Sequence, residues 1–202
     1  MGANSLRFPL LHREGRRGQM SAFLKSRFDR RKNDDYKTID ERCLSALLSC
    51  WHIPPPVWEP CSTEGSAIAD QLEGRGIDAV TTADAFGEVP SGVRSIVTNP
   101  PYKRGLVDKI IGRLSSEVGG ENGITAAAFL VRSQWDHAKS RETILSSPFF
   151  ACLLRLRFRP WWSEERVATP IHDHQWVIFD TGAKNNTPIV KWSEPLRDRD
   201  RI

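Results

Sequence analysis

The chain has 202 residues, of which 39% are hydrophobic and 27% are charged, as is typical of a globular protein with a single domain. It contains no apolar run that approaches the roughly 20 residues of a membrane-spanning helix. Its N-terminus lacks the apolar stretch of a secretory signal. We therefore expect a cytoplasmic protein with no membrane partner.

The cysteines Cys43, Cys50, Cys61 and Cys152 are scattered, and no two of them have the spacing of a zinc-binding pair. The short segment His172-Asp173-His174 offers alternating ligands, but no further ligand cluster accompanies it. We expect free thiols and no metal site.

Positive charge is concentrated at the start of the chain. Residues 1–32 hold nine Lys or Arg side chains against two acidic ones, which gives this segment a net charge of +7, while the remaining residues sum to −3. A basic arm on a nearly neutral domain fits binding to a phosphate backbone, although a solvated tail without a partner has the same composition.

Hydrophobic spacing predicts helices and strands that alternate along the chain. The predicted helices cover residues 38–50, with Thr38 or Asp40 as the cap, 65–72, 106–118 and 137–145. The predicted strands cover residues 57–59, 77–82, 93–98, 124–131, 149–158 and, as the last one, 175–180, with a loop over 159–174. This alternation is typical of an α/β protein with parallel strands. We divide the chain into a partly disordered arm over 1–32, a domain over 33–182 and a tail over 183–202.

Polar side chains stand where the first strands end. Glu59 ends the first predicted strand, Asp84 follows the second, and Asn99 follows the third. Ligands of open α/β sheets bind at the carboxyl ends of the strands. We therefore expect these residues to lie along one edge of the sheet.

The third strand leads directly into Asn99-Pro100-Pro101-Tyr102. An exocyclic amine on a nucleobase is a poor nucleophile because its lone pair is delocalised into the ring. Two acceptors on its N–H bonds, the Asn99 side-chain oxygen and the Pro100 carbonyl, would direct the lone pair at a methyl donor. The prolines make the turn rigid, and Tyr102 offers a flat face for stacking.

This tetrapeptide after an apolar strand resembles the catalytic motif of amino-group methyltransferases that use S-adenosylmethionine, and most closely that of the DNA N6-adenine methyltransferases. The segments 58–65 and 175–180 are similar to their first cofactor motif and their closing hairpin strand. The resemblance implies a Rossmann-like class I methyltransferase fold, with a mostly parallel sheet, an antiparallel final strand and helices on both faces.

The resemblance also implies which residues contact S-adenosyl-L-methionine. Tyr36 and Thr38 match the segment that covers the methionine part of the cofactor. The turn after the first strand and the two later strand ends complete the expected set, namely Glu59, Pro60, Cys61, Gly65, Asp84 and Asn99. Asp84 would hold the ribose hydroxyls or lie beside the adenine of the cofactor.

The region between the last two predicted strands faces the substrate base in the resembling family. Its aromatic and basic side chains suit stacking on an unpaired base and contact with its phosphates. The expected substrate-binding residues are Tyr102, Trp135, Arg159, Trp161, Trp162 and His174.

These residues lead to one favoured function and several alternatives. The favoured function is methylation of the N6 amino group of adenine in DNA, in the cytoplasm of a bacterial or phage-like host. The same chemistry would serve adenine in RNA, N4 of cytosine in DNA, or a protein glutamine amide. Thr63 stands where the family has a glycine, and together with the basic arm it suggests a catalytically inactive nucleic-acid-binding relative as a further alternative.

Overall fold

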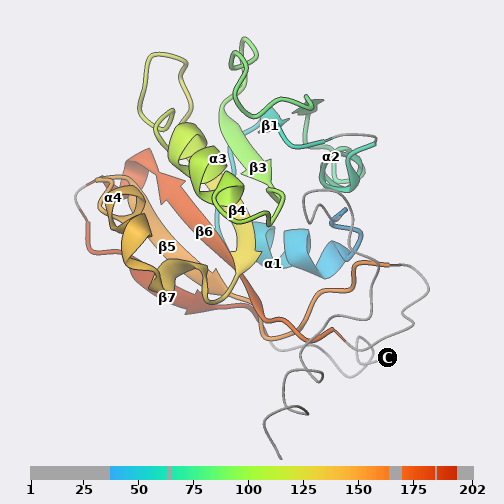
Figure 1. Cartoon of the computed structure of the whole chain (residues 1–202). Coiled ribbons are helices and arrows are strands. Elements are labelled where there is room, and N and C mark those ends of the chain that lie inside the picture. Colours follow the sequence, from blue (N-terminus) through green and yellow to red (C-terminus); the bar gives the residue numbers. More distant parts are fainter. Residues whose placement is uncertain (1–36, 63–64, 164–169, 185, 195–202) are drawn as a thin grey trace, which may run out of the picture.

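A seven-stranded sheet runs through the middle of the protein in the order β2-β1-β3-β4-β6-β5-β7 (Figure 1). The computed structural model describes residues 37–62, 65–163, 170–184 and 186–194. The strands are β1 (Val57–Glu59), β2 (Ala79–Thr81), β3 (Ser95–Thr98), β4 (Ala126–Arg132), β5 (Phe150–Arg155), β6 (His174–Asp180) and β7 (Ile189–Trp192). The basic arm lies outside the described residues, as do Tyr36 and Thr63.

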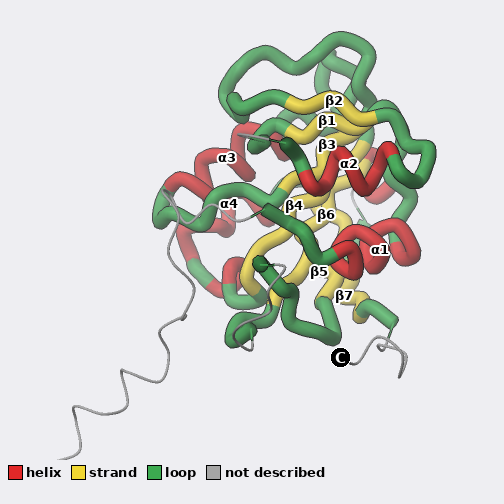
Figure 2. The backbone as a smooth tube through the Cα atoms, turned by 90° about the vertical axis from the view of Figure 1, so that its right-hand side faces the viewer, coloured by secondary structure: helices red, strands yellow, loops and turns green. Residues whose placement is uncertain are grey.

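Four of the six strand pairings are parallel, and both pairings of β6 are antiparallel. The expected fold class, a mostly parallel sheet of the Rossmann-like kind, is therefore confirmed. The strand expected at 175–180 is β6, and it lies between β4 and β5 (Figure 2).

The sheet contains one strand more than the sequence predicts. β7 follows β6 and pairs in parallel with β5, so the antiparallel strand is not the last one in the chain. β7 falls within the segment expected to be a tail. The sequence analysis missed it because an edge strand needs no buried side chains: Ile189, Val190 and Trp192 are all exposed.

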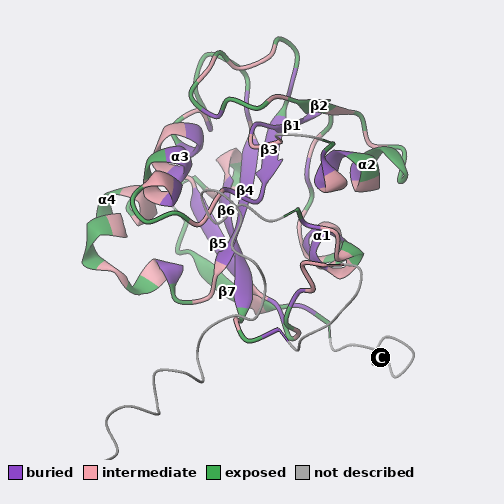
Figure 3. Cartoon of the chain, turned by 45° about the vertical axis from the view of Figure 1, so that its right-hand side comes forward, coloured by how far each residue is buried: buried purple, intermediate pink, exposed green. Residues whose placement is uncertain are grey.

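Helices cover both faces of the sheet, as expected (Figure 3). α1 (Glu41–Cys50) and α2 (Ala67–Glu73) lie on one face, while α3 (Leu106–Ser115) and α4 (Glu142–Leu145) lie on the other. The alternation of side chains along each strand divides the core into two clusters. On β4, Phe129 packs in the cluster that contains Ile111 of α3, and Leu130 packs in the cluster that contains Leu44 of α1.

The observed helices differ from the predicted ones at several ends: α1 begins at Glu41 rather than at residue 38, and α3 ends at Ser115 rather than at residue 118. Asp40 caps α1 by accepting a hydrogen bond from the backbone N–H of Arg42 at 3.2 Å, and Ser66 caps α2 in the same way. The helix expected over 137–145 is instead two short 3-10 turns followed by the four residues of α4. Thus β4 is followed by a compact irregular segment at the edge that carries the polar residues.

Candidate functional site

The 99–102 turn leaves the carboxyl end of β3, whose four residues are all buried. Asn99 is only 6% exposed, Pro100 is buried, and Pro101 and Tyr102 are partly exposed. The chain therefore emerges from the core within the turn itself. The two fixed proline φ angles restrict the backbone of this turn.

The Tyr102 ring sits against the end of β4. Its hydroxyl donates a long hydrogen bond to the carbonyl of Leu130 at 3.4 Å. The guanidinium carbon of Arg132 lies 5.3 Å from the ring centroid. Burial raises the pKa of Tyr102 well above its ordinary value, against a smaller opposing effect of Arg132. The phenol is therefore neutral, and the ring acts as a surface for packing.

Two predicted substrate residues meet Tyr102. The ring of Trp162 packs edge-on at 6.4 Å between centroids, and the imidazole of His174 lies at 5.8 Å. Trp162 and His174 also contact each other, at 5.0 Å. The structure thus brings three of the expected substrate-binding residues together in one aromatic cluster.

His174 is a buried, neutral member of this cluster. Its Nδ1 lies 3.0 Å from the carbonyl of His172, which assigns the ring proton to Nδ1. Its Nε2 is buried, with no hydrogen-bond partner among the described residues. Burial, with a smaller contribution from Arg132, lowers the pKa of His174 to about 3. The imidazole therefore presents an unused acceptor rather than a charge.

A pocket of about 240 Å³ opens beside Tyr102. Trp135 forms part of its wall and is fixed there by a hydrogen bond from its Nε1 to Asp108 at 2.8 Å. Arg141 lines the same pocket, stacks over the Trp135 ring at 5.1 Å and pairs with Asp108. The pocket thus combines aromatic walls with guanidinium groups, which suits a flat, electron-rich ligand.

Three of the residues expected to hold the cofactor lie at the end of β1. Glu59 is 6% exposed and ends β1; Pro60 is buried and Cys61 is partly exposed. Thr82 donates to the Glu59 carbonyl at 3.0 Å, and Ser62 donates to the Thr82 carbonyl at 3.0 Å. These backbone bonds fix the two loops that leave the sheet here.

The segment before α1 covers this turn. The Nζ of Lys37 lies 3.9 Å from where a Cβ on Gly65 would stand, and Gly65 has a φ of +60°. The Thr38 carbonyl accepts a hydrogen bond from Gln71 of α2 at 2.8 Å. The buried Thr38 hydroxyl has no partner among the described residues. The segment before α1 therefore brings a buried hydroxyl without a partner among the described residues, next to a lysine that approaches the turn after β1.

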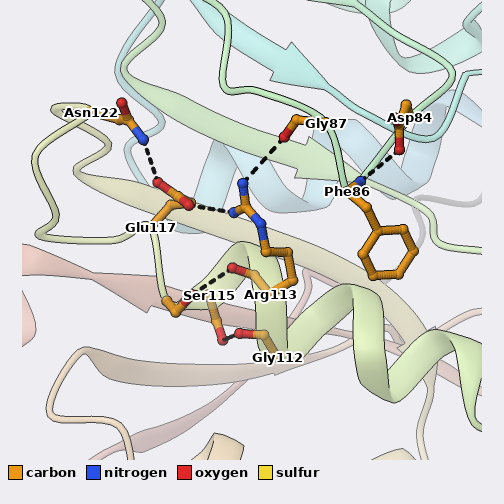
Figure 4. Close-up of polar contacts among 9 residues, drawn as sticks. Asp84, Phe86, Gly87, Gly112, Arg113, Ser115, Glu117 and Asn122 are labelled. Atoms are coloured by element: carbon orange, nitrogen blue, oxygen red, sulfur yellow. Dashed lines mark hydrogen bonds and ion pairs between the residues drawn. The ribbon is translucent and has the colours of Figure 1, made fainter.

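Asp84 lies in an exposed loop after β2, and a side chain of α3 forms a hydrogen bond to this loop (Figure 4). Its carboxylate accepts a hydrogen bond from the N–H of Phe86 at 2.8 Å, and the Phe86 side chain is 52% exposed. Arg113 of α3 donates to the Gly87 carbonyl at 3.2 Å and pairs with Glu117. This loop thus carries an acid and, two residues later, an exposed aromatic side chain.

The two remaining expected substrate residues, Trp161 and Arg159, make contacts to other parts of the protein. The backbone N–H of Trp161 donates to Asp40 at the start of α1 at 3.0 Å. Arg159 pairs with Asp173 at 2.8 Å and lines a second pocket of about 430 Å³.

Several residues that suit a binding role were absent from the sequence prediction. Each lies at the same edge or in the loops that border it, and they are Phe86, Arg132, Arg141, Arg155 and Trp192. For Arg132, the signal available was its position directly after the buried strand predicted over 124–131. Trp192 could not be found from its sequence because the strand that carries it was unexpected.

Among the described residues, no group of three or more His, Cys, Asp or Glu side chains could hold a metal ion. No helix in the described part of the chain is long and apolar enough to cross a membrane.

No protein-family model matches this chain, and no curated protein sequence matches it. Among solved structures it is similar to a candidate class I S-adenosylmethionine-dependent methyltransferase from Listeria monocytogenes, at 10% identity and a TM-score of 0.40, over 70% of this chain and 59% of that one. It is also similar to a modification subunit of a candidate type I restriction enzyme from Vibrio vulnificus YJ016, at 14% identity and a TM-score of 0.37, over 71% of this chain and 44% of that one. The chain thus spans less than two thirds of either neighbour.

Proposed function

We propose that this protein transfers a methyl group from S-adenosylmethionine to an exocyclic amino group of a nucleobase, with N6 of adenine in DNA as the favoured target. The observation that carries the proposal is the rigid turn Asn99-Pro100-Pro101-Tyr102 at the carboxyl end of β3. It places an amide and a carbonyl next to an aromatic cluster and a pocket of about 240 Å³.

The residues around β1 fit the cofactor. Glu59 offers a buried carboxylate at the strand end, and the Thr38 hydroxyl is a buried polar atom without a partner among the described residues. Asp84 and the exposed Phe86 ring lie together on the neighbouring loop. We assign Glu59 and Asp84 to the hydroxyl and amine groups of the nucleoside, Phe86 to its base, and Thr38 to the amino acid part.

S-adenosylmethionine supplies, when bound, a methyl group on a positively charged sulfur. The protein's task is to orient the amine. The Asn99 side-chain oxygen and the Pro100 carbonyl would accept hydrogen bonds from the two amine N–H groups, which favours a pyramidal nitrogen whose lone pair is withdrawn from the ring and directed at the methyl group. With that methyl group supplied, the two acceptors would hold the amine in line for transfer, and the amine would release one proton to water.

The two titratable rings nearest the turn favour orientation over base catalysis. The Tyr102 phenol has a raised pKa and stays protonated, while the His174 imidazole has a pKa lowered to about 3 and is a weak base. Neither is suited to remove a proton from a neutral amine. We therefore assign Tyr102 to stacking against the base and His174 to accepting a hydrogen bond from the ligand through Nε2.

A base inside a duplex cannot reach this turn. It must leave the stack, at a cost of about a few kcal/mol, and be received by aromatic walls. Tyr102, Trp135 and Trp162 supply such walls, and Arg132 and Arg141 supply positive charge beside them. This combination favours a nucleic acid over a protein amide as the substrate.

The test is methyl transfer from radiolabelled S-adenosylmethionine to DNA, RNA and protein substrates, followed by nucleoside analysis of the product. We expect label in N6-methyladenine from DNA. Label in RNA adenine, in N4-methylcytosine or in a glutamine amide would replace the favoured substrate and keep the chemistry. Absence of transfer to all of them, with micromolar cofactor binding absent in calorimetry, would reject the enzyme function.

A matched pair of variants tests the turn. Asn99→Ala should lower turnover by at least a hundredfold while the cofactor dissociation constant changes little. Asn122→Ala is the control, because Asn122 is exposed in the loop before β4 and bonds only Glu117 among the described residues. Retained turnover in Asn99→Ala would remove the role assigned to this side chain.

A further inference from the structure

The second pocket, of about 430 Å³, lies where β5 and β7 end. Its wall contains three arginines, Arg155, Arg157 and Arg159, together with Trp192 and Asp173. The strand ends that form it are fixed by backbone bonds: Ser193 donates to the Arg155 carbonyl at 2.9 Å, and Arg157 donates to the Ser193 hydroxyl at 3.0 Å. The pocket is therefore built on the sheet rather than on a free loop.

The charge of this pocket is unbalanced. Asp173 is the only carboxylate that the described residues contribute to its wall, and it already pairs with Arg159 at 2.8 Å. Arg155 and Arg157 form no ion pair with any described residue. The Nε–H of Arg155 is buried and lacks an acceptor among the described residues. Two uncompensated guanidinium groups in one concave site favour an anion, and their planar donors match a phosphate group.

Trp192 adds an aromatic surface to this charge. The guanidinium carbons of Arg155 and Arg157 lie 5.6 and 5.8 Å from its ring centroid, and half of the residue, 52%, remains exposed. A large exposed aromatic beside two arginines is the arrangement that proteins use to stack on a base and hold its phosphate. The pocket thus favours a nucleotide over an inorganic anion.

The two pockets flank the same pair of strand ends. Arg132 of β4 and His174 of β6 stand opposite each other in the strand register. Arg132 lines the first pocket, and the His174 ring contacts Tyr102, which lines the same pocket. Ser133, directly after β4, and Asp173, directly before β6, both line the second pocket, and the Ser133 N–H donates to the Asp173 carbonyl at 2.9 Å. The pockets are therefore adjacent along one edge of the sheet.

We infer that the Arg155–Arg157–Trp192 pocket binds a nucleotide next to the target base on the same strand, with its phosphate on the arginines and its base on Trp192. This inference rests on the proposed function for the identity of the target pocket. It gives the enzyme a contact with the flanking strand that does not depend on the basic arm.

The test measures binding of a dye-labelled single-stranded DNA 12-mer to the full-length protein by fluorescence anisotropy, without cofactor, over a series of salt concentrations. Inorganic polyphosphate is the competitor that lacks bases. Arg157→Gln should weaken DNA binding several-fold and make the salt slope shallower by about 0.7, the value for one lost phosphate contact on a single strand. Trp192→Ser should weaken DNA binding roughly tenfold and leave polyphosphate binding unchanged, while Trp192→Phe retains most of the affinity.

Two variants serve as controls. Arg94→Gln removes an exposed arginine directly before β3, at the sheet edge away from both pockets. Ile189→Ser changes an exposed apolar residue of β7 that points to the face of the strand opposite to Trp192. Both should bind DNA as the unmodified protein does. Unchanged DNA binding in Arg157→Gln and Trp192→Ser, or an equal loss of polyphosphate binding in Trp192→Ser, would overturn the inference. The binding assay involves no methyl transfer, so its result is independent of the methylation assay. If the pocket variants lose DNA binding but no methylation is found, the pocket is supported and the proposed methyl transfer is not. If DNA is methylated but the pocket variants bind it normally, only the pocket inference is rejected.

Discussion

The rings of Tyr102 and His174 lie 5.8 Å apart between centroids, although one residue follows β3 and the other begins β6. This contact closes the gap between the 99–102 turn and the loop that precedes β6. It also places the Tyr102 ring beside a neutral, buried imidazole. The turn and the aromatic cluster therefore act as one surface.

Replacing Tyr102 separates stacking from hydrogen bonding. Tyr102→Phe keeps the ring and removes one long hydrogen bond, to Leu130 at 3.4 Å, so we expect methyl transfer within about threefold of the unmodified protein, since such a bond contributes about 1 kcal/mol or less. Tyr102→Ala removes a base-stacking face worth about 1–3 kcal/mol, and kcat/KM should fall by tenfold or more. Equal losses in the two variants would assign the hydroxyl, and not the ring, the main role.

The order of strands and helices was predictable because the buried strands and the buried faces of the helices have clear apolar patterns in the sequence. β4 is apolar from Ala126 to Val131, and α3 carries an apolar stripe through Ile110, Ile111 and Leu114. β7 carries no such mark, because it borders the sheet and its apolar residues are exposed. The irregular segment after β4 was expected to be a helix, since its 3-10 turns have local spacing close to that of an α-helix.

The site was predictable where chemistry follows a strand end, and unpredictable where it depends on contacts between distant segments. Glu59 and Asn99 lie at the expected edge because parallel strands share a direction. The engagement of Trp161 with the cap of α1 and of Arg159 with Asp173 could not be read from a loop sequence. The contacts of Arg155 and Arg157 with the Trp192 ring could not be predicted, because Trp192 lies in β7 and that strand was not predicted.

Gly65 and Gly76 form a matched pair for the turn that we assign to the cofactor. Both have positive φ, +60° and +73°, so Gly→Ala at either position strains the backbone by about 1–2 kcal/mol. Only Gly65 has Lys37 close to the added Cβ. We expect both variants to lose similar stability in urea unfolding, and Gly65→Ala alone to weaken S-adenosylmethionine binding in calorimetry. Equal cofactor affinity in the two variants would contradict the placement of the cofactor at Gly65.

Arg113 is a positioning residue for the loop that holds Asp84 and Phe86. Arg113→Gln removes the hydrogen bond to the Gly87 carbonyl and the pair with Glu117, so the loop loses its brace on α3. We expect the cofactor dissociation constant to rise several-fold with little change in DNA binding, measured by calorimetry and anisotropy. Arg94→Gln is the control for loss of an arginine charge. A parallel loss of DNA binding in Arg113→Gln would point to a general structural defect.

Burial of His174 makes the stability of the fold depend on pH in a defined window. The pKa of His174 is lowered to about 3 in the folded protein, against 6.5 for an unperturbed histidine. Between these values the unfolded chain binds one more proton than the folded chain, so the free energy of unfolding falls as the pH is lowered through this window, by up to about 1.4 kcal/mol per pH unit from this residue. Above pH 6.5 the residue contributes no pH dependence.

Urea unfolding at pH 7, 6, 5 and 4.5 measures this effect. The free energy of unfolding should decline less steeply with falling pH in His174→Gln than in the unmodified protein. His52→Gln, which removes an exposed histidine, is the control and should leave the decline unchanged. If His174→Gln declines as steeply as the unmodified protein, the imidazole is protonated in the folded state, and its assignment as a neutral acceptor for the ligand is wrong.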